Sequence, residues 1–182
     1  STMKKWSVFV LLIFTMLQMF AQPNTTKIEE AVFTKGYLYR QEIFSVDNIY
    51  AFRIDAIKVT NLEKFNFTSG IRVVQKILFG KKPETITNYI DIEEIEGIIT
   101  ALQYMKTILK NKTIPSSYTE IKYNTTSGFQ VMIVTVINEQ DKLGWNFMIQ
   151  SKMAEERTLV NLPISEIDKL YNAFEQAKTK LH

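Results

Sequence analysis

The chain has 182 residues, of which 46% are hydrophobic, and this length supports one domain with a hydrophobic core of its own. Cysteine is absent, which excludes disulfides, thiolate catalysis and iron–sulfur or zinc–thiolate sites. The formal net charge is +3, and two of the cations, Lys4 and Lys5, lie in a segment that is predicted below to be removed. The remaining chain is close to neutral, unlike most proteins that bind phosphate backbones or anionic membranes.

Residues 1–21 have the pattern of an export signal. Two lysines precede an apolar run from Trp6 to Phe20, and polar residues follow Ala21. As a helix, this run would span about 22 Å, less than the roughly 30 Å hydrocarbon core of a bilayer. We therefore predict a signal peptide cleaved after Ala21 and a periplasmic or secreted protein, with an uncleaved N-terminal membrane anchor as the alternative. Ser1 and Thr2, which precede the first methionine, are expected to be remnants of an expression vector.

The next part of the chain is predicted to contain four strands. Residues 22–35 are expected to be a linker. Asp47-Asn48 has turn chemistry, and Asn61–Gly70 is expected to be a long connection that carries Phe65 and Phe67. Alternating apolar and polar residues predict strands at Tyr37–Phe44, Tyr50–Val59, Ile71–Phe79 and Thr85–Ile90.

A helix is predicted to begin after Asp91. Asp91 and Glu94 form a capping-box pattern, in which Asp91 accepts hydrogen bonds from the first amides of the helix and Glu94 reaches back to the Asp91 amide. Apolar residues then recur at helical spacing and predict one buried stripe: Ile95, Ile98, Ile99, Leu102, Met105 and Leu109.

The second half repeats this plan. The continuous apolar run Phe129–Ile137 predicts a strand that is buried on both faces or that has a central position in its sheet. A second amphipathic helix is predicted to begin near Pro163, because proline is favoured in the first helical turn. The other strands are predicted at Tyr118–Tyr123, Leu143–Gln150 and Thr158–Leu162.

The two halves are related in sequence. Ile71–Leu109 aligns without a gap with Leu143–Leu181 at an offset of 72, and nine of the 39 pairs are identical. Chance would give roughly two or three identities, so we infer an internal duplication. We predict an α+β fold in which a ββββα unit, an antiparallel sheet with one amphipathic helix, occurs at 36–113 and again at 114–182 within a single domain. Neither unit alone could cover its sheet, so the two are expected to share a core.

In element order, this duplicated unit resembles the repeats of the purine-rich-element-binding (PUR) proteins and the plant Whirly proteins, which bind single strands of nucleic acid on their sheets. The resemblance implies a basic sheet surface with exposed aromatic residues. Residues that could contribute to it are Tyr37, Tyr39, Arg40, Arg53, Arg72 and Trp145. The export signal and the near-neutral charge argue against a nucleic-acid partner, so single-strand binding is kept as an alternative.

The sequence contains few residues for catalysis or metal binding. The only histidine is His182, the last residue, so the common nucleophile–histidine pairings are excluded. Zinc, calcium-loop, P-loop and dinucleotide motifs do not occur, and we expect neither a metal nor a cofactor. Acidic residues cluster at the start of the first helix, where they stabilise its dipole. A carboxylate-based glycan hydrolase that uses Glu93, Glu96 or Glu156 is an alternative.

The signal that ends in Phe20-Ala21-Gln22, followed by a small domain rich in Tyr and Lys, is similar to uncharacterised small exported proteins of Gram-negative bacteria. This resemblance implies a location in the envelope or outside the cell. Because catalytic groups are scarce, we predict a non-catalytic domain that binds a protein, a peptide or an envelope component. The candidate binding residues lie where the two copies differ or on the expected sheet face: Phe65, Phe67, Trp145, Tyr37 and Tyr39.

Overall fold

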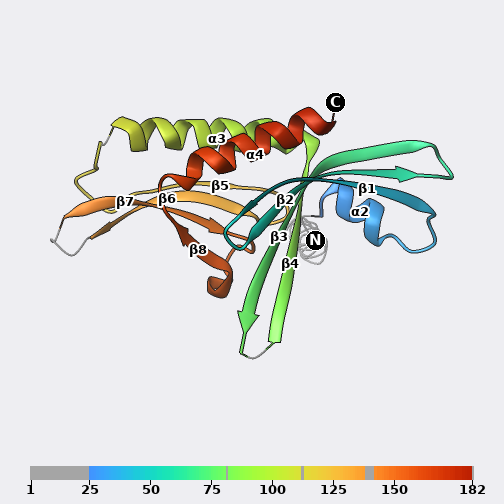
Figure 1. Ribbon diagram of the computed structural model, residues 1–182, viewed down its shortest axis with the longest axis horizontal. Coiled ribbons are helices and arrows are strands. Elements are labelled where there is room, and N and C mark those ends of the chain that lie inside the picture. Colours follow the sequence, from blue (N-terminus) through green and yellow to red (C-terminus); the bar gives the residue numbers. More distant parts are fainter. Residues whose placement is uncertain (1–24, 81, 112, 138–141, 182) are drawn as a thin grey trace, which may run out of the picture.

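The computed structural model describes residues 25–80, 82–111, 113–137 and 142–181, which form two four-stranded antiparallel sheets and three α-helices (Figure 1). The predicted α+β architecture with a repeated four-stranded sheet is therefore confirmed. The predicted signal peptide, residues 1–21, lies outside the described residues.

The first sheet is a meander in the order β1-β2-β3-β4 and is followed directly by α3. The bounds are β1 (Tyr39–Ile49), β2 (Phe52–Asn61), β3 (Asn66–Phe79), β4 (Lys82–Asp91) and α3 (Ile92–Asn111). Five residues of the predicted helical stripe, Ile95, Ile98, Ile99, Leu102 and Met105, are buried on α3. The period of apolar residues therefore identified the face of α3 that meets the core.

The second sheet repeats the meander in the order β5-β6-β7-β8 and is followed by α4. The bounds are β5 (Glu120–Asn124), β6 (Gln130–Ile137), β7 (Leu143–Gln150), the 3-10 turn η1 (Glu156–Thr158), β8 (Leu159–Leu162) and α4 (Glu166–Leu181). The helix expected to begin near Pro163 begins at Glu166, because the Pro163 carbonyl accepts the Glu166 amide at 2.9 Å in a preceding turn.

The helices of the two repeats pack across both sheets. α4, from the second repeat, packs on β1, β2 and β3 of the first sheet. α3, from the first repeat, packs on β5 and β6 of the second sheet and also on β3 and β4 (Figure 1). Each helix thus covers apolar surface that belongs to the other repeat, so neither repeat buries its own sheet without the other.

Three phenylalanines join the two halves in one core. Phe52 of β2, Phe129 before β6 and Phe174 of α4 are all fully buried and belong to the same apolar cluster. The rings of Phe52 and Phe129 meet edge-on at 6.5 Å between centroids, and those of Phe129 and Phe174 stack at 6.3 Å. Phe129 therefore contacts the first sheet on one side and the helix of its own repeat on the other.

The expected linker at 22–35 contains a helix, so that prediction was wrong. α2 (Lys27–Phe33) begins with a complete capping box between Thr26 and Glu29. It packs on β2, β3 and β4 of the first sheet (Figure 1). Seven residues are too few to show a helical period in the sequence. Such a short helix is marginal by itself, and here tertiary contacts hold it.

Two predicted connections in the first sheet also differ from the structure. The expected connection Asn61–Gly70 is mostly strand, since β2 and β3 pair as far as Asn61 and Asn66. The polar residues of this segment are typical of a loop, yet the pairing of β2 with β3 continues through most of it. The expected turn at Asp47-Asn48 lies inside β1, just after a bulge at Val46. The chain reverses instead between Ile49 and Phe52, where Tyr50 has a positive φ of 53°.

The cap of α3 differs in part from the predicted capping box. The Asp91 amide donates to Glu94 Oε2 at 3.4 Å, which is the expected return contact. The Asp91 carboxylate, however, accepts the amides of Lys27 at 2.7 Å and Ile28 at 3.2 Å, which begin α2. Asp91 therefore connects the end of β4 to the N-terminus of α2, a long-range contact that local sequence could not show.

Asp91 should make stability depend on pH in a defined direction. Burial raises the pKa of Asp91, and the amides of Lys27 and Ile28 oppose the shift. The pKa of Asp91 is therefore higher in the folded state than in the unfolded state. The stabilisation from this group is fully present below the unfolded-state pKa, about 4, and is lost as pH rises through the folded-state pKa. We expect the unfolding free energy of the wild type, relative to Asp91→Asn, to be larger at pH 4 than at pH 7 in urea titrations.

Glu120→Gln is the matched control for this pH dependence. Hydrogen bonds from Lys122 and Tyr118 lower the pKa of Glu120. The advantage of the wild type over Glu120→Gln should therefore shrink as pH falls, which is the opposite sign. If the unfolding free energy of the wild type relative to Asp91→Asn also became smaller toward acid pH, the raised pKa of Asp91 would be contradicted.

Candidate functional site

Three of the five predicted binding residues line one groove. Tyr37, Tyr39 and Phe67 line a hollow of about 320 Å³ between α2 and the first sheet. Phe67 borders it from β3, but its side chain lies on the opposite face of the sheet, where Lys58 Nζ is 4.2 Å from the ring centre. Phe65 lies at the adjacent β2–β3 turn, is 85% exposed and has a positive φ of 54°. We call this hollow the α2 groove. Its full lining is Lys27, Glu30, Ala31, Thr34, Tyr37, Tyr39, Val59, Asn61, Lys64, Asn66, Phe67 and Thr68.

The floor of the α2 groove is a regular part of the first sheet. Tyr39 pairs with Asn61, and Asn61 pairs with Asn66, so these three residues form one cross-strand row. Val59 and Thr68 form a second row two residues further along β2, and their side chains lie on the same face. The groove therefore presents polar and aromatic side chains from three neighbouring strands on a rigid support.

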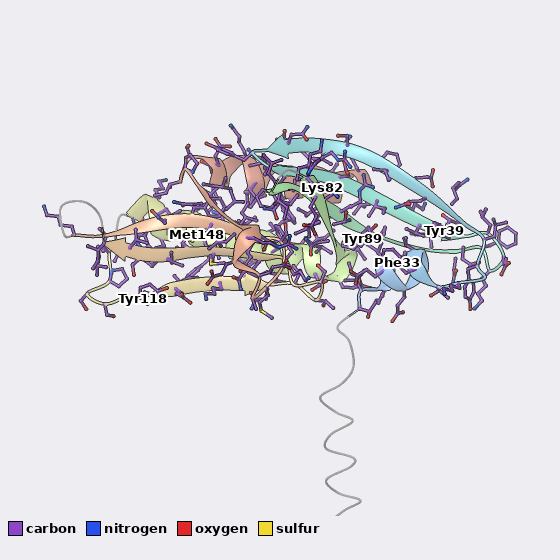
Figure 2. All side chains as sticks on the ribbon, turned by 90° about the horizontal axis from the view of Figure 1, so that it is seen from below. Phe33, Tyr39, Lys82, Tyr89, Tyr118 and Met148 are labelled. Carbon is purple, nitrogen blue, oxygen red and sulfur yellow. The ribbon has the colours of Figure 1, made fainter. Side chains whose placement is uncertain are left out.

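α2 forms a wall of the groove and is held by polar and apolar contacts. Besides the two amide bonds to Asp91, Ile28 is fully buried in a small cluster with Ile57, Val59 and Tyr89. Phe33 packs edge-on against Tyr89 at 6.4 Å, and Figure 2 shows these two side chains together, with Tyr39 farther along the same sheet. These contacts fix α2, the wall of the groove, to the first sheet.

Gly70 of β3 allows α2 to approach the sheet. A Cβ atom at this position would lie 2.6 Å from Ile28 Cδ1 and 2.1 Å from the carbonyl oxygen of Ile90. Real Cβ atoms essentially never approach other atoms so closely. A side chain at position 70 would therefore disturb both the docking of α2 and the β3–β4 pairing.

The two lysines of the groove are both engaged. Lys27 Nζ pairs with the Glu93 carboxylate, and this hydrogen bond raises the pKa of Lys27. Lys64 Nζ lies 5.4 Å from the centre of the Tyr37 ring, within cation–π range. The groove accordingly has no unengaged cluster of cations among its described residues.

Several polar side chains of the groove have unused hydrogen-bonding capacity. Asn61 Oδ1 accepts the amides of Glu63 and Lys64, both at 2.9 Å, which leaves its NH₂ group as a donor. Within the described ranges, the side chains of Glu30, Asn66 and Thr68 form no hydrogen bond with protein atoms. The groove thus offers donors and acceptors that the fold itself does not use.

Trp145 lies in the hydrophobic core and outside the α2 groove. It is on β7 of the second sheet, and 9% of its surface is exposed. Its indole Nε1 donates to the Thr113 carbonyl at 2.8 Å, which satisfies the one polar atom of the side chain. The difference between the copies at this position, Trp145 against Val73, is therefore a difference in core packing.

Two of the three acids proposed for a hydrolase pair with basic residues, and none of the three lines the α2 groove. Glu93 pairs with Lys27, and Glu96 pairs with Lys178 of α4. Glu156 lies in η1, at the second sheet. The α2 groove contains one carboxylate, Glu30. In the described part of the chain, no group of three or more His, Asp or Glu residues could hold a metal ion.

The arginines named for a nucleic-acid surface are paired with acids of the first sheet, and two of them share one carboxylate. Asp55, 1% exposed, accepts from Arg72 at 2.7 and 3.1 Å and from Arg53 at 3.1 Å. Arg40 pairs with Glu42 at 3.3 Å. These contacts reduce the positive field that a phosphate backbone would require.

Comparisons with protein-family models, with curated proteins and with solved structures find no match to this chain. The resemblance in element order to the PUR and Whirly repeats therefore stays a prediction. Among the helices of the described residues, none is long and apolar enough to cross a membrane.

Sequence reasoning missed the part of the groove that α2 contributes. Lys27 and Glu30 lie in the predicted linker, although Thr26-Lys27-Ile28-Glu29 has the spacing of a capping box. That pattern was a usable signal for a helix start. The pairing of Asn61 with Asn66 was missed because both residues were placed in a connection. Residues 62–65, Leu-Glu-Lys-Phe, contain none of the usual turn residues, so the sequence has no strong hairpin signal there.

Proposed function

We propose that the chain is an exported, non-catalytic binding domain that works in the bacterial envelope or outside the cell. Its binding site is the α2 groove, and its partner is a protein, a peptide or another envelope component. The observation that carries the proposal is that Tyr37 and Tyr39 line a groove together with Glu30, Asn66 and Thr68, whose side chains form no hydrogen bond with protein atoms in the described ranges. A concave site with a few convergent polar groups beside aromatic rings has the usual features of a small-ligand site.

The supporting chemistry is a mixture of rings and hydrogen-bonding groups. Tyrosine rings supply contact area at a small cost in conformational entropy, and the tyrosine hydroxyl adds a polar contact. Asn66 and Glu30 can fix the orientation of a polar ligand. The single carboxylate and the absence of histidine from the groove favour binding over hydrolysis.

A pair of double variants tests the groove directly. The test variant is Tyr39→Val with Asn66→Ala, and the control is Tyr118→Val with Asn161→Ala. Tyr118 and Asn161 are exposed and belong to the second repeat. In Figure 2, Tyr118 lies at the opposite end of the molecule from Tyr39. Each pair removes one tyrosine ring and one amide, so loss of stability or solubility should be comparable.

We expect purified wild-type protein to sediment with isolated outer membranes or peptidoglycan sacculi from Gram-negative cells, or to bind a peptide array. The groove variant should bind at least tenfold more weakly, which corresponds to about 1.4 kcal/mol, and the control should bind as the wild type does. Equal binding by the groove variant and the control, or no binding by any of the three proteins, would contradict the proposal.

A further inference from the structure

We propose that the ligand of the α2 groove is a hydroxyl-rich saccharide of one or two rings. This inference rests on the proposed binding function and specifies its ligand class. It follows from the size of the groove, from the hydrogen-bonding groups that line it and from the aromatic residues beside them.

The size of the groove suits a small ligand. Its volume of about 320 Å³ is near the lower end of the range for small-molecule sites, roughly 300–1,000 Å³. The groove is bounded by α2 on one side and by the β2–β3 turn at its end, where Lys64 is located. A saccharide of one or two rings fits such a space.

The polar groups of the groove match a ligand in which each group both donates and accepts. The Asn61 amide presents its NH₂ donors, because its oxygen is used in the turn. Asn66 and Thr68 each provide a donor and an acceptor, and the Glu30 carboxylate provides acceptors. Sugar hydroxyls can satisfy all of these groups at once, since each hydroxyl donates one hydrogen bond and accepts others.

Tyr39 and Tyr37 supply the apolar surface that a sugar ring also needs. Tyr39 lies in the same cross-strand row as Asn61 and Asn66, so a ligand bonded to these amides would lie beside its ring. The ring faces carry negative charge density, which attracts the slightly positive C–H groups on the flat side of a pyranose. Tyr37 is 40% exposed, and Lys64 lies over its ring.

Phosphate and peptide ligands match the groove less well. A phosphate ligand requires available cations, but Lys27 pairs with Glu93 and Lys64 lies over Tyr37. An extended peptide could add to the edge of β3, since β4 pairs with β3 only as far as Gly70. That leaves just residues 66–69 without a β4 partner, which is a short template for main-chain hydrogen bonds.

The test uses two arrays and four proteins. Wild type, Tyr39→Val/Asn66→Ala, Tyr118→Val/Asn161→Ala and Tyr39→Phe are applied to an array of mono-, di- and trisaccharides of hexoses, hexosamines and uronic acids. The same proteins are applied to an array of random decapeptides. Circular dichroism and thermal unfolding establish that each variant is folded. Positive spots are then titrated by isothermal calorimetry with the free saccharide or peptide.

We expect saccharide binding by the wild type, a loss of at least tenfold in the groove variant, and unchanged binding in the control. Tyr39→Phe keeps the ring and should lose less than Tyr39→Val/Asn66→Ala. Groove-dependent binding to peptides but not to saccharides would overturn this inference and leave the proposed binding function intact. Saccharide binding that the groove variant retains would place the site elsewhere and overturn the inference. No groove-dependent binding on either array would overturn this inference, and it would overturn the proposed function as well if sedimentation with outer membranes and sacculi is also independent of the groove.

Discussion

Phe129→Ala should lower the free energy of unfolding by about 3–5 kcal/mol, the usual range for removing a fully buried phenylalanine ring. Phe129 is fully buried, and its ring contacts both Phe52 and Phe174. The cavity would open between the first sheet and α4, where neither element can collapse without moving the other. The substitution should therefore weaken both repeats at once.

Urea denaturation followed by two probes can measure this coupling. Fluorescence of Trp145 reports on the second sheet, whereas far-ultraviolet circular dichroism reports on all elements. In a chain without residues 1–21, Trp145 is the sole tryptophan. Both transitions should shift together by the same free energy. Phe65→Ala, at a side chain that is 85% exposed, should change stability by less than about 0.5 kcal/mol. Separate transitions for the two probes would show that the repeats do not share one cooperative core.

Gly70→Ala should destabilise the protein by about 1–3 kcal/mol, the cost typical of forcing extra volume into a packed position. The added Cβ would lie 2.1 Å from a backbone oxygen, that of Ile90, so rotation of a side chain cannot relieve the contact. It would also lie 2.6 Å from Ile28 Cδ1 and displace α2 from the sheet. We therefore expect faster amide hydrogen exchange in α2 and weaker ligand binding in the groove.

Gly144→Ala provides the matched control for Gly70→Ala. Gly144 is also a strand glycine, and a Cβ atom there would meet nothing within 4 Å. Replacing it should be neutral or should stabilise the protein by up to about 1 kcal/mol, because alanine loses less conformational freedom on folding. Chemical denaturation of both variants checks the prediction. A similar loss in both, or no loss in Gly70→Ala, would contradict the role assigned to Gly70.

The main features of the repeat could be predicted because they depend on local periodicity. The apolar stripe Ile95–Met105 is sufficient to identify α3 and the face that it buries. The offset of 72 identified equivalent elements in the two halves, and the structure contains a four-stranded meander in each. These features follow from spacing along the chain, which the sequence shows directly.

The candidate site could be predicted only in part. Tyr37 and Tyr39, predicted as aromatic residues of the sheet face, line the groove. Phe67 borders the groove, but its side chain points to the opposite face of the sheet, toward Lys58. Trp145, predicted on the same grounds, lies in the core instead, where its indole donates to the Thr113 carbonyl. Alternation along a strand shows which side chains share a face of the sheet. Which of the two faces is buried depends on the elements that cover the sheet, and these cannot be identified from the strand's own sequence.

The sequence by itself determined the two ββββα units, the positions of their strands within a few residues and the buried stripe of α3. The tertiary structure decided which sheet each helix covers, and it made α2 a wall of the groove. The physical reason is the range of the interactions involved. Strand alternation and helical spacing depend on neighbours a few residues apart, whereas the carboxylate of Asp91 binds amides 63 and 64 residues away. Contacts of that range arise only when the whole chain has folded.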